Sequence, residues 1–268
     1  MQGYLDMLRR EQRRYASTSA TTWVNPSALE QYDLGGVDCP DCGNTGYILE
    51  RGEGILEVHS YECRCMKRRR TLRALRKAGM EDMAQRCTLE SYRTDTPQCA
   101  AIAEAARRFI AADSGWFFIA GQSGSGKTHI CTAICTGLME QKGKEIDFMP
   151  WRDEARTLKA AGDPVRCDTR IRRLRSVPVL YIDDLFKGGA SEADLRLAFE
   201  ILNGRYNDTR LRTVISSELD LEAILRLDEA VGGRIYERSS GFTVRAPAVN
   251  RRLRRTGQKT PPPDGSGV

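Results

Sequence analysis

The chain of 268 residues contains no apolar run that approaches the length of a membrane-spanning helix, and it contains no internal repeat. Residues 1–15 are charged and amphipathic, so they lack the apolar centre that a secretory signal peptide requires. These absences predict a protein of the cytoplasm without a membrane partner. An apolar content of 40% is enough for one sizeable domain and a smaller one.

Strong charge of one sign is also missing, because the formal net charge is only +6 and the pI is about 8.9. One basic stretch, residues 64–78, contains no acidic residue. Such a stretch suits contact with a nucleic-acid backbone, and it equally suits a solvated linker helix. Nothing in it indicates recognition of particular bases.

Cysteine, in contrast, is frequent, and four of the nine cysteines form the pattern C-x2-C-x20-C-x-C. In a reducing compartment such pairs bind metal more often than they form disulfides, and four thiolates suit tetrahedral Zn²⁺. The predicted ligands are Cys39, Cys42, Cys63 and Cys65. His59 is an alternative to one of the second pair, and four buried free thiols are the remaining alternative. The other cysteines are interpreted as ordinary core or surface residues.

A glycine-rich segment, Gly121 to Thr128, fits G-x-x-x-x-G-K-[ST], the phosphate-binding P-loop. It follows an apolar run and precedes a helix-like run, which is the strand–loop–helix setting that the motif needs. Its amides and the helix N-terminus face an anion, Lys127 reaches the β- and γ-phosphates, and the Thr128 hydroxyl ligates Mg²⁺. The predicted ATP-contacting residues here are Gly121, Ser123, Gly124, Ser125, Gly126, Lys127, Thr128 and His129.

A buried type of strand, residues 177–182, ends in Asp183 and Asp184, the Walker B pattern. We expect Asp183 to hold Mg²⁺ beside Thr128 and Asp184 to activate the attacking water. The next strand ends at Ser217 and Glu218, and either one is a candidate to sense the γ-phosphate, because the carboxyl ends of strands face the ligand crevice.

Two arginine-containing segments follow. An arginine from a neighbouring subunit can stabilise charge on the transferred phosphoryl group, and Arg234 is the first candidate, with Arg238 second. A salt bridge to a nearby acid is the alternative for both. Arg252, in a basic segment, is the candidate for a cis contact to the nucleotide, and a plain basic helix or strand is the alternative.

Strand-like runs alternate with helical patterns from about residue 87 to 247, which predicts an α/β fold with a parallel sheet flanked by helices. The predicted organisation is an N-terminal region at 1–86 with a zinc module at about 36–66 and a basic linker helix. An ATPase domain at 87–258 and a disordered tail at 259–268 follow.

The combined order of cysteine module, basic linker, P-loop, Asp-Asp and the segment Gly-Gly-Arg-Ile-Tyr-Glu resembles AAA+ replicative-helicase loaders of the DnaC/DnaI type, in their phage-like versions. The resemblance covers roughly residues 36–255. It implies an N-terminal region that grips the hexameric replicative helicase, and an AAA+ domain that binds ATP and single-stranded DNA and assembles with copies of itself. It also implies that Arg234 is the trans arginine finger, that Arg252 is the sensor-2 arginine and that Tyr92 lies near the adenine. Many AAA+ proteins carry Asn where Ser217 and Glu218 stand and Glu where Asp184 stands.

The leading hypothesis is therefore an ATP-switched loader that delivers a hexameric DNA helicase to single-stranded DNA, with weak ATPase activity when alone. The alternatives are a transposition-helper ATPase of the IstB type that coats duplex DNA, and a nucleotide-binding adaptor that never hydrolyses ATP. The absence of a substrate lid or acceptor-binding motif argues against a small-molecule kinase.

Overall fold

The computed structural model describes residues 22–23, 39–51, 58–77, 81–160 and 162–251, which form two compact units, Met1–Arg69 and Arg70–Val268. The expected N-terminal helix and the C-terminal tail lie outside the described residues. No helix among the described residues is both long enough and apolar enough to cross a membrane.

The larger unit is built on a five-stranded parallel sheet with the order β5-β6-β7-β4-β8. The central strands are buried along their length, as their continuous apolar runs predict for a sheet covered on both faces. The strands are β4 (Trp116–Ala120), β5 (Ile146–Pro150), β6 (Val179–Leu185), β7 (Arg212–Ser217) and β8 (Thr243–Arg245).

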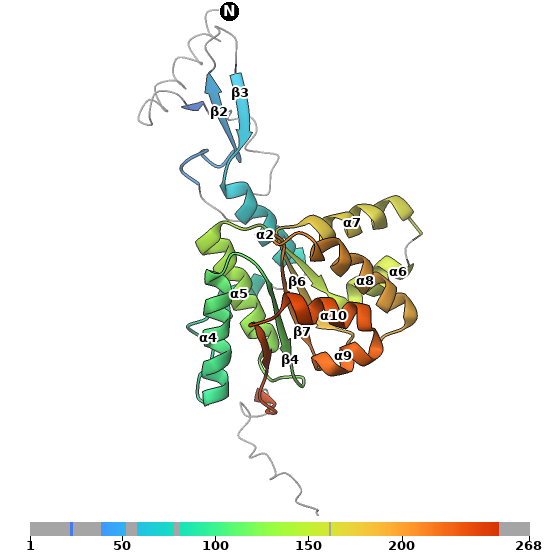
Figure 1. The fold of residues 1–268 in the computed structure, drawn as a ribbon. Helices are drawn as coiled ribbons and strands as arrows, with labels where there is room; N and C mark the ends of the chain where they lie inside the picture. Colours follow the sequence, from blue (N-terminus) through green and yellow to red (C-terminus); the bar gives the residue numbers. More distant parts are fainter. Residues whose placement is uncertain (1–21, 24–38, 52–57, 78–80, 161, 252–268) are drawn as a thin grey trace, which may run out of the picture. The chain divides into compact units, whose positions relative to one another are not determined.

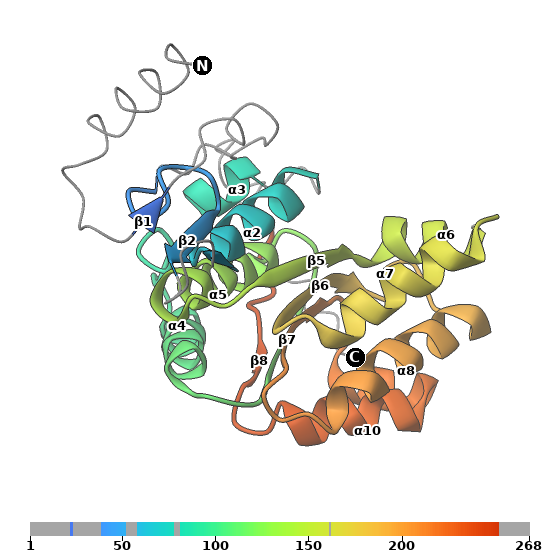
Figure 2. The same cartoon turned by 90° about the horizontal axis from the view of Figure 1, so that it is seen from above.

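Alternate side chains of each strand enter two separate cores, one on each face of the sheet. Phe117 and Ile119 of β4 pack in the core on the face that carries α4 (Pro97–Ala111) and α5 (Lys127–Lys142). Trp116 and Phe118 pack on the opposite face, and Figures 1 and 2 show the two helical layers. The helices of the second layer are α6 (Trp151–Ala160), α7 (Pro164–Ser176), α8 (Glu192–Tyr206), α9 (Leu221–Leu227) and α10 (Glu229–Arg238). The prediction of a parallel sheet flanked by helices is confirmed.

The second helical layer is anchored by a buried cation as well as by apolar packing. Arg205 of α8 is fully buried, and its guanidinium donates to the carbonyl oxygens of Leu174, Val177 and Arg212 at 2.7–2.9 Å. Since buried carbonyls without partners are costly, this one side chain fixes α8 against the end of α7 and the start of β7.

The smaller unit contains a three-stranded antiparallel sheet in the order β1-β2-β3. Its strands are β1 (Thr22–Trp23), β2 (Tyr47–Arg51) and β3 (Val58–Glu62). The helix expected in the basic stretch is present as α2 (Cys65–Lys77), and it is followed by α3 (Glu81–Arg86) in the larger unit.

Candidate nucleotide site and cysteine centre

The P-loop connects the carboxyl end of β4 to the first turn of α5. Gly126 is the N-cap of α5 and has φ = 96°, a left-handed conformation that favours glycine. Gly124 has φ = 75°, and a Cβ atom built there would lie 2.2 Å from the Oδ1 atom of Asn250. Ser125 is buried within the loop, whereas Ser123 is exposed. The loop therefore presents backbone amides at a helix N-terminus, as the motif requires.

Lys127 points back over the loop that precedes it. Its ammonium donates to the carbonyl oxygens of Gly121 and Gln122 at 2.7 and 3.1 Å, and its side chain is only 4% exposed. The same ammonium lies 3.8 Å from Asp184 Oδ1. The cation is thus held between the phosphate-binding loop and the end of β6, where a γ-phosphate would compete for it.

Asp183 lies beside Thr128, as predicted, with 3.4 Å between Thr128 Oγ1 and Asp183 Oδ1. Two more hydroxyls donate to the same carboxylate oxygen, Ser216 at 2.6 Å and Tyr181 at 2.5 Å. Burial raises the pKa of Asp183 above that of an ordinary aspartate, and the hydroxyls of Ser216 and Tyr181 oppose that rise. A buried carboxylate next to a hydroxyl is a suitable donor set for a hard cation such as Mg²⁺.

Ser216 was not singled out from the sequence, because its place beside Asp183 follows from the register of two strands. Ile182 and Ile215 are partners in the parallel register of β6 and β7, so the next residues of the two strands, Asp183 and Ser216, are neighbours. The Ser216 hydroxyl also accepts a hydrogen bond from the Asp184 N–H at 2.8 Å. One serine therefore positions both acids at the end of β6.

Asp184 adopts a left-handed backbone conformation with φ = 54°, which is uncommon for a residue with a side chain. The register between β6 and β7 shifts at this point, between Ile182 and Leu185. The carboxylate is only a quarter exposed, and Lys187 Nζ donates to its Oδ2 atom at 2.6 Å. Asp184 is thus bracketed by two lysine ammonium groups, those of Lys127 and Lys187.

The two candidates at the end of β7 have different surroundings. Ser217 is fully buried, and its hydroxyl donates to the Leu185 carbonyl at 2.8 Å and accepts from the Leu219 N–H at 3.1 Å. Glu218 lies 3.4 Å from Lys187 Nζ. Glu218 is therefore linked to Asp184 through Lys187, whereas the Ser217 hydroxyl joins backbone segments.

Tyr92 packs against the first turn of α5 and is 3% exposed. Its ring meets the His129 ring edge-on with 5.4 Å between centroids, and a Cβ atom built on Gly126 would lie 3.6 Å from it. Burial raises the pKa of Tyr92 to about 12. His129 Nε2 lies 3.0 Å from the Thr88 carbonyl oxygen, so it ties the segment before Tyr92 to α5.

The last described residues return to the P-loop. The Ala246 N–H donates to the Ala120 carbonyl at 2.7 Å, and the Arg251 N–H donates to the Gly124 carbonyl at 2.9 Å. The Arg251 guanidinium lies 5.4 Å from the centroid of the Tyr92 ring. Arg252, the predicted cis arginine, lies outside the described residues.

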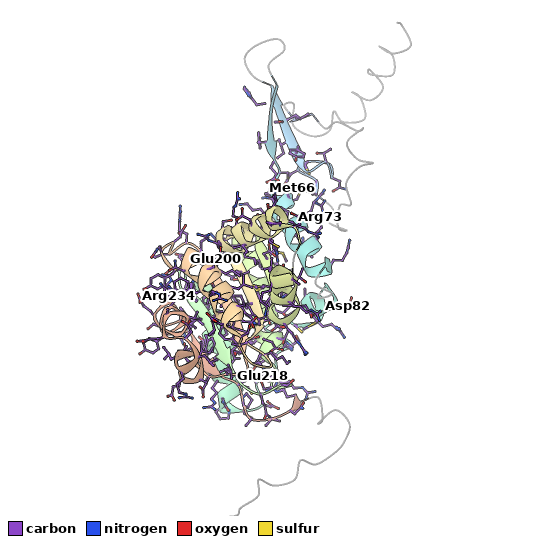
Figure 3. The ribbon with its side chains drawn as sticks, turned by 90° about the vertical axis from the view of Figure 1, so that its right-hand side faces the viewer. Met66, Arg73, Asp82, Glu200, Glu218 and Arg234 are labelled. Atoms are coloured by element: carbon purple, nitrogen blue, oxygen red, sulfur yellow. The ribbon has the colours of Figure 1, made fainter. Side chains whose placement is uncertain are left out.

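Arg234 lies on α10, in the helical layer across the sheet from α5. Its guanidinium donates to Asn203 Oδ1 at 3.0 Å and lies 4.6 Å from the centroid of the Phe199 ring, both on α8. Figure 3 labels Arg234 and Glu200, a residue of α8, on the same side of the domain. The guanidinium of Arg238, the second candidate, lies 5.9 Å from the Trp116 ring centroid.

The four paired cysteines are all buried, and their sulfur atoms lie within 4.8 Å of one another. Cys39 and Cys63 are 3.8 Å apart, and Cys42 and Cys65 are 3.6 Å apart. A tetrahedron with Zn–S bonds of about 2.3 Å places its sulfurs about 3.8 Å from one another. The cluster therefore fits one Zn²⁺ ion. His59, the alternative ligand, is exposed on β3 and is not part of this cluster.

A tight turn shapes the first cysteine pair. Gly46 has φ = 82°, and a Cβ atom built there would lie 2.6 Å from the Met66 sulfur. The Gly46 N–H donates to Cys42 Sγ at 3.3 Å. Burial opposes ionisation of Cys42, but this N–H and the neighbouring thiols lower its pKa to about 7, whereas burial and the Cys42 sulfur raise the pKa of Cys65. A dication is the group that would allow all four sulfurs to ionise together.

The sequence matches the family model described as IstB-like ATP binding protein over residues 55–232. The chain belongs to this IstB/DnaC-like family of AAA+ ATP-binding proteins. The family accounts for the parallel sheet and for the ATP-binding loop at its centre. The first cysteine pair lies before the matched residues.

Three individual proteins are informative. The phage-like element PBSX protein XkdC of Bacillus subtilis is 31% identical over 226 residues, which cover 79% of this chain and 83% of XkdC. The replicative helicase loader DnaC of Escherichia coli is 24% identical over 182 residues, which cover 66% of this chain and 71% of DnaC. The crystal structure of DnaI aligns with a TM-score of 0.54 at 21% identity, covering 63% of this chain and 92% of that one. The predicted resemblance to DnaC/DnaI-type proteins is confirmed at the level of family and fold.

Proposed function

We propose that this protein is an ATP-hydrolysing loader that binds a hexameric replicative DNA helicase and delivers it onto single-stranded DNA. The observation that carries the proposal is the joint presence of a complete Walker-type site and a four-cysteine cluster in one chain. It is supported by the similarity to the helicase loader DnaC over 66% of the chain and to a phage-like element protein over 79%.

The proposed hydrolysis uses residues that already surround one point at the carboxyl edge of the sheet. The P-loop amides and Lys127 bind the β- and γ-phosphates, and Thr128 with Asp183 holds Mg²⁺. Mg²⁺, when bound, neutralises negative charge on the phosphate oxygens. Asp184 accepts the proton of the water that attacks the γ-phosphorus, a new P–O bond forms, and the bond to the β–γ bridging oxygen breaks with ADP as leaving group.

Tyr92 and Arg251 flank the first turn of α5, and we propose that the adenine binds beside Tyr92. Arg252 belongs to the same C-terminal segment and would contact the nucleotide in cis. The Tyr92 ring packs on the turn that follows the P-loop. Because the Tyr92 ring is itself buried, it would hold the first turn of α5 and Arg251 in place beside the base rather than stack on it.

Arg234 would act on the ATP of a neighbouring copy of the chain. Its position on the helical layer opposite α5 suits a residue that is presented to another subunit rather than to its own P-loop. ATP bound between copies would then favour the assembled state, because the nucleotide has more contacts in it, and hydrolysis would release the loader. The candidates for the γ-phosphate sensor remain Ser217 and Glu218.

We propose that the N-terminal region up to residue 86 binds the helicase. Zinc in this region would be held by Cys39, Cys42, Cys63 and Cys65. Few apolar side chains are available near the cysteine pairs, so zinc would supply much of the folding free energy of this module.

Co-purification with a hexameric bacterial replicative helicase tests the loader function. Wild type, Lys127→Ala and a chain that lacks residues 1–86 are compared, with the shortened chain first shown by circular dichroism and ATP-analogue binding to be folded. Binding by wild type and loss of binding by the shortened chain are expected. If folded wild type with ATP does not bind the helicase, the loader function is wrong.

A transposition-helper ATPase is the second candidate, because the matching family model is itself described as IstB-like. The observation against it is that Cys39 and Cys42 precede the matched residues, 55–232, so that model does not include the first half of the sulfur cluster. ATP-dependent coating of duplex DNA by wild type, seen by electron microscopy, together with no helicase binding, would favour this candidate.

A further inference from the structure

The end of β6 contains an ion-pair chain that the Walker B pattern does not require. Lys187 follows the two acids by a tight turn in which its N–H donates to the Asp184 carbonyl at 3.0 Å. Its ammonium donates to Asp184 Oδ2 at 2.6 Å and lies 3.4 Å from Glu218 Oε1. Backbone and side chain of one residue therefore both hold Asp184.

The three side chains are only partly exposed, 25% for Asp184 and 35% each for Lys187 and Glu218, so solvent does not fully screen the pairs. The left-handed backbone of Asp184 and its N–H bond to Ser216 fix the direction in which the carboxylate leaves the strand. The same turn also fixes the position of Lys187. The Lys187–Asp184 ion pair is therefore determined by the backbone of this loop and is not a chance surface contact.

A carboxylate that activates water needs a free oxygen lone pair directed at that water. The Lys187 ammonium occupies Oδ2 of Asp184, and the Lys127 ammonium lies 3.8 Å from Oδ1. Glu218 is the second acceptor for the Lys187 ammonium, and it stands at the end of β7 next to the buried Ser217. A shift of Lys187 toward Glu218 would free Asp184, whereas the observed pairing restrains it.

We propose that Lys187 is a positioning residue that restrains Asp184 when the chain is alone, and that Glu218 is the competing acceptor that draws Lys187 away from it. The proposal rests on the ATP hydrolysis proposed above. In this arrangement, slow turnover of the isolated chain is caused by an occupied base, not by weak binding of ATP. Lys187 acts through Asp184 and does not itself contact the phosphates.

The expected changes in kcat have opposite signs for substitutions of Lys187 and of Glu218. Lys187→Gln raises kcat of the isolated chain by about three- to tenfold, because Asp184 Oδ2 is then free to accept a hydrogen bond from water, and it leaves KM for ATP unchanged. Glu218→Gln lowers kcat, because Asp184 is then the sole carboxylate of the two with which Lys187 can pair. The double variant behaves like Lys187→Gln, because the competitor has no effect once the lysine is absent.

Steady-state ATP hydrolysis and binding of a fluorescent ATP analogue by the full-length chain test this. Lys159→Gln is the matched control, because Lys159 pairs with Asp194 at the same 2.6 Å and with 34% exposure but lies on α6. It is expected to leave kcat unchanged. Lys187→Arg, which keeps the charge, is expected to keep the low wild-type rate.

A Lys187→Gln variant that binds the analogue normally and hydrolyses ATP no faster than wild type overturns the proposal, as does a fall in kcat. Additive effects in the double variant also overturn it. Failure of ATP hydrolysis itself is distinguishable, because then Asp184→Asn and wild type give the same rate in every assay while both bind the analogue.

Discussion

At the residue scale, the site is organised around the carboxylate of Asp183. Three hydroxyl groups, from Thr128, Tyr181 and Ser216, surround one of its oxygens at 2.5–3.4 Å. Burial without such donors would favour the neutral acid, which cannot hold a cation. The hydroxyls therefore keep a buried aspartate available as a metal ligand, and one of them, Ser216, also positions the neighbouring Asp184.

Asp184→Asn is expected to lower kcat for ATP hydrolysis by about 100- to 1,000-fold, because the amide cannot accept a proton from water. Binding of a fluorescent ATP analogue should remain, since Lys127 and the P-loop amides are unchanged. Lys127→Ala is the contrasting variant and should lose binding as well. Unchanged hydrolysis in Asp184→Asn would instead support an adaptor that does not use ATP hydrolysis.

The sequence predicts the pair Thr128 and Asp183 because both belong to motifs with a fixed position at strand ends. It does not predict which of two adjacent serines meets the acid, because the faces of β7 depend on its register with β6. The role of Lys187 was also missed, since an ion pair within a tight turn has no spacing signature.

At the element scale, the alternation of buried strands and helices was predicted, and β4 to β7 lie within three residues of the expected runs, 116–120, 145–149, 177–182 and 213–217. The strand β8 was not predicted, because it has three residues and no buried one. The alternating pattern did not give bounds for α6 and α7, the helices between β5 and β6. Two arginines of α7, Arg170 and Arg173, both bind Asp147 on the edge strand β5.

The cysteine cluster leads to a prediction for the small unit. Cys42→Ser should lose about one equivalent of zinc per chain, because three thiolates and a hydroxyl bind the ion far more weakly than four thiolates. Hydrogen exchange should then accelerate in β2 and β3 and remain unchanged in the parallel sheet. Zinc released by a thiol-modifying reagent and counted with a chromogenic chelator gives the stoichiometry.

Cys167→Ser serves as the control, because Cys167 lies on α7 outside the cluster. Full zinc content in Cys42→Ser would contradict the four-thiolate centre.

At the scale of the whole molecule, the chain combines a unit with the four-cysteine cluster and a unit with the P-loop, each with its own sheet. Arg234 lies on the face of the latter unit across from its P-loop helix, so its predicted role requires a second copy. Variants of the chain can test this role of Arg234 without a structure of the assembly.

Arg234→Ala and Asp184→Asn are each expected to be nearly inactive alone. An equal mixture should regain roughly a quarter of wild-type activity, because an active interface needs the P-loop of one variant and the arginine of the other. The measurement is ATP hydrolysis at concentrations that favour assembly. A mixture as inactive as its two components would argue that Arg234 does not act across subunits.

The strand order has a consequence for how the protein is made. β4 precedes the P-loop, and among the described residues Phe118 pairs with Ile215 of β7 and Thr243 of β8, which are translated long after it. A nascent chain must therefore keep the apolar strand β4 unpaired until β7 has been made, and contacts between such distant residues form slowly. Because the Arg251 N–H donates to the Gly124 carbonyl, the P-loop obtains this contact only after residue 251 has been made. Nucleotide binding is thus expected to stabilise a chain that extends beyond residue 251 more than a shorter one.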